Sequence, residues 1–166
     1  PMHALQPTMR RMLLAARLSG VSLLGTWGAL QLAVPWVSKI TAEEAQTMNL
    51  EGVEADAYKS KARSMTQIAA AIGAIIGTMI GGLLGHSIGR RPTYFLLCLS
   101  SLASALYFFL FNTGYGTHLL ITVGIAGATT ASFYGWLPLY LPELFRTSVR
   151  ATGQGFAFNF GRIIAA

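Results

Sequence analysis

Charge is scarce in this sequence. Charged residues make up 11% of the chain, whereas a typical soluble domain has about 25%. So few charges could not cover the surface of a soluble fold of 166 residues. Hydrophobic residues reach 53%, and the 18 glycines suit membrane helices, where glycine is commoner than in soluble ones. The composition excludes an ordinary soluble domain and favours a membrane protein.

Residues that carry catalysis or bind metals are few and scattered. The one cysteine, Cys98, lies inside an apolar run, which excludes a disulfide framework. The three histidines, His3, His86 and His118, fall in three separate regions. No nucleophile with a nearby base and no metal-ligand spacing can be recognised. We therefore predict a protein that is not an enzyme, without catalytic residues, metal site or cofactor.

The net charge of +6 raises the question of nucleic-acid binding. The basic residues do not gather on one stretch, however, and instead sit in small groups between long uncharged runs. This pattern predicts no nucleic-acid partner.

Long apolar runs account for most of the chain. A membrane-spanning helix needs about 20 mostly apolar residues. The segments that qualify are residues 18–37, 65–85, 93–111 and 119–141, with a fifth that begins at 153 and is cut off at 166. The sequence opens at Pro1 and stops inside an apolar run, which we interpret as a piece of a longer protein.

Basic residues alternate with these runs. Arginines occupy residues 1–17 and the connections 86–92 and 142–152, whereas residues 112–118 have no charge. If the spans alternate in direction, these basic connections share one side, which the positive-inside rule makes cytoplasmic. We predict a multi-pass protein of the plasma (inner) membrane with that orientation.

The connection at residues 38–64 is the longest, and it would be external. It holds five of the six acidic residues of the chain. Thr41 followed by Glu44 fits a capping box, so we predict a short solvated helix inside this external loop.

Glycines recur at every fourth position of the second span. Gly73, Gly77, Gly81 and Gly85 would form one smooth helix face, which lets a neighbouring backbone come close. We predict tight helix packing there, a face compatible with helices that slide or rock.

The end of that span carries a recognisable motif. Residues 82–92 read G-L-L-G-H-S-I-G-R-R-P. This stretch resembles the signature loop of the major facilitator superfamily, roughly G-x-x-x-D-R-x-G-R-R. Gly82, Gly89, Arg90 and Arg91 match it, whereas His86 stands in place of the usual aspartate.

A second motif is more specific. Residues 140–155, Y-L-P-E-L-F-R-T-S-V-R-A-T-G-Q-G, resemble the stretch between the tenth and eleventh helices of such transporters, with Arg146 in place of a proline. The first span, with its G-T-W-G at 25–28, is similar to the seventh helix of the organic-acid, sialate and nicotinate-type (sugar-porter-like) branch. The resemblance implies an all-α polytopic transmembrane helix bundle, from helix seven to the start of helix eleven. It also implies a missing N-terminal half of the same carrier as partner.

Glu143 is the one acidic residue outside the external loop. Arg90, Arg91 and Arg150 lie in the same predicted cytoplasmic connections. The resemblance implies that these four residues form an ion-pair network that holds the cytoplasmic side closed and breaks on rocking. A plain surface salt bridge of little energetic value is the alternative.

Arg162 lies about ten residues into the fifth span. A charge at the membrane centre costs at least about 2.5 kcal/mol, so it normally faces a cavity or a partner. The resemblance associates an arginine at this point with anionic substrates, and a structural ion pair is the alternative. Polar and aromatic residues could complete a substrate cavity, although packing or an interface anchor is the favoured explanation of each: Trp27, Gln31, Tyr134, Trp136 and Asn159.

These features predict a transporter of small organic solutes, in particular organic acids or anions, embedded in the lipid bilayer and working by alternating access. No acidic residue lies inside a span. If the carrier is a proton symporter, its coupling carboxylate would therefore belong to the missing half. The alternative is a non-transporting membrane subunit or an inactive, truncated half-carrier.

Overall fold

The computed structural model is all-α, which confirms the predicted fold class. It describes residues 2–165, and the side chains of residues 9–25, 28 and 30–163. The described chain has six α-helices: α1 Met2–Leu23, α2 Gln31–Thr47, α3 Gly52–Ser87, α4 Arg90–Phe111, α5 Thr117–Tyr140 and α6 Arg150–Ala165. The π-helix η1 (Leu24–Leu30) joins α1 to α2, and the 3₁₀ turns η2 (Leu141–Leu144) and η3 (Thr147–Val149) lead from α5 to α6.

Three of the described helices are long and apolar enough to cross a membrane: Gly52–Ser87, Arg90–Phe111 and Thr117–Leu144. They contain the predicted spans 65–85, 93–111 and 119–141. The predicted first span is divided among α1, η1 and α2, and the predicted fifth falls in the 16-residue α6. None of these elements combines the length and the hydropathy of a membrane span within the described residues.

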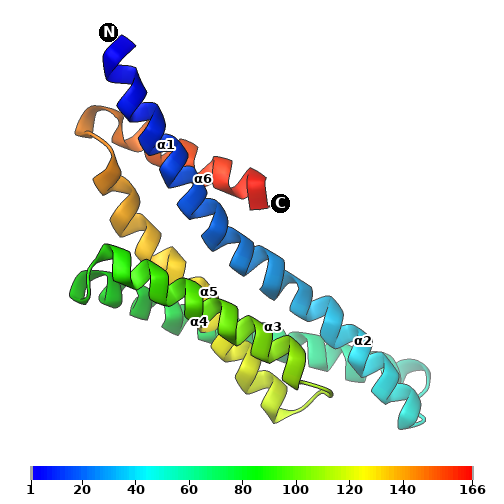
Figure 1. The fold of residues 1–166 in the computed structure, drawn as a ribbon. Coiled ribbons are helices and arrows are strands. Elements are labelled where there is room, and N and C mark those ends of the chain that lie inside the picture. Colours follow the sequence, from blue (N-terminus) through cyan, green and yellow to red (C-terminus); the bar gives the residue numbers. More distant parts are fainter. Residues whose placement is uncertain (1, 166) are drawn as a thin grey trace.

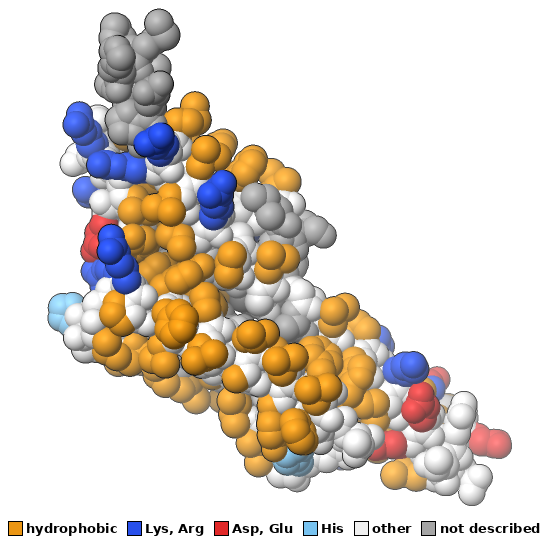
Figure 2. All heavy atoms as spheres, in the orientation of Figure 1, with side chains coloured by type: hydrophobic (Ala, Val, Ile, Leu, Met, Phe, Trp, Pro, Cys, Tyr) orange, Lys and Arg blue, Asp and Glu red, His pale blue; other side chains and the backbone are white. Residues whose placement is uncertain are grey.

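Large apolar side chains cover the outer surface of α3 and α4, and Figure 2 shows apolar side chains over much of one face of the molecule. Met79 is 68% exposed, Phe95 is 71% exposed and Leu110 is 69% exposed. An apolar surface of this extent suits lipid contact far better than water. The helices and their surface are those of a membrane protein.

The chain begins as one long rod. In Figure 1, α1, η1 and α2 run end to end from residue 2 to residue 47. Leu23 and Gln31, which flank the π-helix, both keep helical backbone angles, so the rod passes through η1 without a break. Short π segments inside helices are frequent at functional sites.

The predicted external loop at 38–64 is mostly helical. Helix α2 continues to Thr47 and α3 begins at Gly52, so only residues 48–51 form a turn. The predicted capping box is wrong, because the Thr41 hydroxyl lies inside α2 and donates a hydrogen bond to the Val37 carbonyl at 2.8 Å. Helix formation outside the apolar segment needs no hydrophobic run, so hydropathy alone could not locate these helix ends.

Helices α3 and α5 lie in close backbone contact. A Cβ atom added at Gly73, Gly77 or Gly81 would overlap with a backbone carbonyl oxygen of α5. The oxygens concerned are those of Gly124, Ala128 and Ser132. Gly135 of α5 faces the Thr78 carbonyl of α3 in the same way. Only glycine permits this approach.

Helices α1 and α6 form a second close pair, side by side in Figure 1. A Cβ added at Gly161 would lie 2.8 Å from the Ser19 Cβ and 2.9 Å from the Gly20 nitrogen. Gly153, Ala157 and Gly161 recur at every fourth position of α6, and all three are buried. This second row of small residues was not predicted.

The two ends of the bundle differ in charge. At one end the Arg11 guanidinium donates to the Leu144 carbonyl at 3.4 Å, and Arg90 pairs with Glu143. At the other end the Tyr115 backbone N–H donates to the Glu44 carboxylate at 2.8 Å. Figure 2 shows Lys and Arg side chains gathered mainly at the first end, and most of the acidic side chains, with a few basic ones, at the second. We call them the basic end and the acidic end. The assignment of the basic end to the cytoplasm remains a prediction.

Candidate functional site

The connections at the basic end are joined by one ion pair. Arg90 is the first residue of α4, and Glu143 lies in the 3₁₀ turn after α5. The Arg90 Nη2 donates to Glu143 Oε1 at 2.6 Å, and its Nε lies 3.2 Å from Oε1 and 3.1 Å from Oε2. The Arg90 Nη1 also donates to the Gly85 carbonyl at 2.6 Å. The guanidinium thus joins the end of α3 to the end of α5.

The local backbone positions both partners. Gly89 has φ 98°, a conformation that glycine adopts readily, and it turns the chain so that α4 starts directly after α3. Pro142 near the start of η2 favours the tight turn that presents Glu143. The side chains of Arg90 and Glu143 are 27% and 49% exposed, so the pair lies at the surface of this part of the chain.

The four residues of the predicted gating network do not all meet. Arg90 and Glu143 are in contact, whereas Arg91 and Arg150 are exposed and make no ion pair with any residue the structure describes. Another arginine, Arg11, approaches η2 instead, through the Leu144 carbonyl. In the described structure, one bidentate ion pair between Arg90 and Glu143, with other arginines nearby, therefore stands in place of the predicted four-residue network.

Aromatic residues pack near this pair. Trp136 stacks on Tyr140 with 4.8 Å between ring centroids and lies 5.0 Å from the Tyr94 ring. A Cβ added at Gly85 would lie 2.9 Å from the Trp136 Cδ1, so Gly85 makes room for the indole rather than for a backbone. Trp136 is 1% exposed. It offers no surface to a solute here and belongs to the packing.

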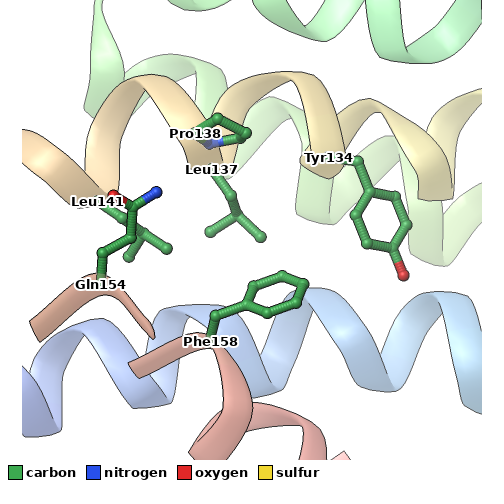
Figure 3. Close-up of a pocket in the computed structure, with 6 residues that line it drawn as sticks. All are labelled: Tyr134, Leu137, Pro138, Leu141, Gln154 and Phe158. Carbon is green, nitrogen blue, oxygen red and sulfur yellow. The ribbon is translucent and has the colours of Figure 1, made fainter. Parts of the chain in front are cut away.

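A pocket of about 250 Å³ lies between the α3/α5 pair and the α1/α6 pair. Helix α5 and η2 supply one wall, and α6 supplies the other (Figure 3). Apolar groups dominate its lining, and its polar side chains are the Tyr134 phenol and the Gln154 amide. The lining residues are Tyr134, Leu137, Pro138, Leu141, Gln154 and Phe158.

Of the predicted substrate-binding residues, Tyr134 lines this pocket. Arg162 is exposed and lies one helical turn beyond the pocket residue Phe158 on α6. Asn159 is exposed, and its amide donates to the Gly155 carbonyl of its own helix at 2.8 Å. Gln31, the first residue of α2, is exposed and outside the pocket lining. The side chain of Trp27 lies outside the described residues.

Gln154 and Phe158 were missed as pocket residues. Their spacing of four residues puts them on one face of α6, a signal that the sequence contains. Nothing in the sequence, however, shows which face of α6 turns toward α5. Among the described residues, no group of three histidine, cysteine or acidic side chains could hold a metal ion.

Comparison with known proteins gives one partial match. No protein-family profile matches the chain, and no solved structure matches it. Over 80 residues the chain is 36% identical to a protein of Cupriavidus pinatubonensis described as a probable 4-methylmuconolactone transporter. The matched stretch covers 48% of this chain and 18% of that relative. The chain thus shares a distant partial similarity with a transporter of an organic solute.

Proposed function

We propose that this chain is part of a multi-pass membrane carrier that moves small organic acids by alternating access. The observation that carries the proposal is the 36% identity over 80 residues with the probable transporter. The match covers 18% of that relative. As the resemblance to facilitator-type carriers implies, the carrier we propose would include a further half that faces this one. Residues 1–17 and the connections 86–92 and 142–152 would lie on the cytoplasmic side.

The pocket and Arg162 would together form this half's share of the substrate site. Arg162 lies twelve residues after the start of α6, which corresponds to about 18 Å along a helix and thus near the middle of a hydrocarbon core of about 30 Å. Its guanidinium can bind a carboxylate at two points. Apolar walls beside it suit the body of a small organic acid, and Tyr134 and Gln154 can orient its polar groups.

The Arg90–Glu143 pair would control access to this pocket. The turn η2 contains both Leu141, which lines the pocket, and Glu143, which pairs with Arg90. Any movement of η2 large enough to separate Glu143 from Arg90 therefore also moves a wall of the pocket. This shared turn supports a gating role for the Arg90–Glu143 pair. As a surface ion pair, it would add little to the stability of the fold.

The substrate role is tested with variants of the intact gene product in an uptake assay. Arg162→Ala should abolish uptake of labelled carboxylic acids at unchanged expression. Arg162→Lys, which keeps the charge but not the planar fork, should retain weak uptake with a raised KM. Ile163→Ala is the matched control, because Ile163 is the exposed neighbour on α6. Normal uptake by Arg162→Ala would remove Arg162 from the site.

A further inference from the structure

One carboxylate joins three segments at the acidic end. Glu44 lies near the end of α2. Its Oε2 accepts a hydrogen bond from the Tyr58 hydroxyl of α3 at 2.8 Å, and its Oε1 accepts one from the Tyr115 N–H of the α4–α5 connection at 2.8 Å. The rings of Tyr58 and Tyr115 meet edge to face with centroids 5.9 Å apart. All three side chains are half-buried.

Asn112 also fixes the α4–α5 connection, at the end where it leaves α4. Asn112, which is buried, donates to the Phe108 carbonyl at 2.9 Å and to the Thr122 hydroxyl at 2.8 Å. Its Oδ1 lies 2.9 Å from Nδ1 of His118. These contacts fasten the short connection to α4 and α5. A displacement of Tyr115 is therefore passed on to the start of α5 rather than absorbed by a loose loop.

The position of Glu44 links the two close helix pairs. Helix α2 continues the rod that begins with α1, which pairs with α6. Tyr58 belongs to α3, and Tyr115 belongs to the connection that leads into α5. The pocket lies between these pairs, with one wall on α5 and the other on α6. Because α2 continues the rod of α1, we expect a change in the separation of the pairs at the acidic end to change the distance between α5 and α6 across the pocket.

We propose that Glu44 is a positioning residue that ties the two helix pairs together at the acidic end and so sets the geometry of the pocket between α5 and α6. The link to transport rests on the proposed function, whereas the tie itself does not. Glu44 binds two neutral donors, a phenol and a backbone N–H, so the tie depends on the placement of its carboxylate rather than on a cationic partner.

Two glycines of the connection provide a matched pair of variants. A Cβ added at Gly114 would lie 2.7 Å from Glu44 Oε1, so Gly114→Ala must displace the carboxylate. At Gly116 nothing lies within 4 Å, so Gly116→Ala changes the same loop without touching Glu44. Neither glycine has a positive φ, and backbone strain therefore does not distinguish the two variants.

The test measures the distance between spin labels at Gln46 on α2 and Thr117 on α5, both exposed, in a Cys98→Ala background. Glu44→Ala and Gly114→Ala should broaden the distance distribution or lengthen it by several ångströms, whereas Gly116→Ala should match the unchanged protein. Identical distributions in all variants would overturn the tie. This readout needs no substrate, so it decides the matter even if the protein carries no organic acid.

The effect on transport is a second readout. Glu44→Ala should raise KM at least threefold at matched membrane levels, because a displaced pocket wall weakens substrate binding. A merely structural residue would lower the amount of protein and leave KM unchanged. An unchanged KM in a variant with a broadened distance distribution would overturn the role of Glu44 in shaping the pocket.

Discussion

Arg90 and Glu143 are 53 residues apart in sequence, yet the Arg90 guanidinium contacts both carboxylate oxygens of Glu143. The same guanidinium binds the Gly85 carbonyl at the end of α3. The neighbouring Arg91 is exposed and has no ion-pair partner among the described residues. Arg90 thus joins the ends of α3 and α5, while the charge of Arg91 remains on the surface.

Loss of the Arg90–Glu143 ion pair should open the pocket to solvent at the basic end. In a Cys98→Ala background, a cysteine at Gln154, which lines the pocket, would report access to a membrane-impermeant maleimide. Glu143→Gln and Arg90→Ala should raise the labelling rate several-fold, because neither variant keeps the bidentate contact. Arg91→Ala is the matched control and should label at the unchanged rate. Equal rates in all variants would contradict a gating role.

The close contact of α3 with α5 makes a stability prediction. Gly77→Ala should lower the free energy of unfolding by about 1–3 kcal/mol, because the added Cβ overlaps with the Ala128 carbonyl and must push the helices apart. Gly82→Ala is the control, since its Cβ would lie 3.7 Å from the Gly135 oxygen, an ordinary contact. Thermal unfolding in detergent compares the two. A Gly77→Ala protein as stable as Gly82→Ala would show that the contact is looser than the structure has it.

The close contact between α1 and α6 can be tested independently. Gly161→Ala should separate α6 from α1 and lower the melting temperature, because its Cβ would lie 2.8 Å from the Ser19 Cβ. Gly155→Ala, on the same helix with nothing within 4 Å, should be neutral. Equal melting temperatures for the two variants would show that the position of α6 does not depend on this contact.

The orientation is tested by labelling intact cells. Thr113 belongs to the exposed part of the α4–α5 connection, and Ser148 lies exposed in η3. In a Cys98→Ala background, Thr113→Cys should react with an impermeant maleimide added outside, whereas Ser148→Cys should react only after permeabilisation. The reverse pattern would invert the orientation.

The apolar helices could be predicted closely from the sequence. The predicted spans 93–111 and 119–141 correspond to α4 at Arg90–Phe111 and α5 at Thr117–Tyr140. The predicted span 65–85 lies inside the much longer Gly52–Ser87. Residues 52–64 include five charged side chains, and a helix outside the hydrocarbon core keeps its backbone hydrogen bonds without needing an apolar run.

Contacts between distant residues could not be predicted. The glycine row of α3 pointed to a close neighbour, but not to α5. Which arginine meets Glu143 depends on the turn at Gly89, whose φ is 98°. The contact between Glu44 and Tyr115 joins residues 71 positions apart, and no local pattern announces it. Such pairings follow from helix packing angles and register, which hydropathy does not encode.

Transport by the purified, intact gene product is the most direct test of the central claim. The protein would be reconstituted in liposomes loaded with unlabelled solute, and uptake of labelled aromatic acids, sialic acid and sugars would be followed by counterflow. The account predicts saturable uptake of at least one carboxylic acid, which Arg162→Ala abolishes and Ile163→Ala retains. Proteoliposomes that accumulate none of the acids above the level of empty liposomes, with folded protein present, would contradict it.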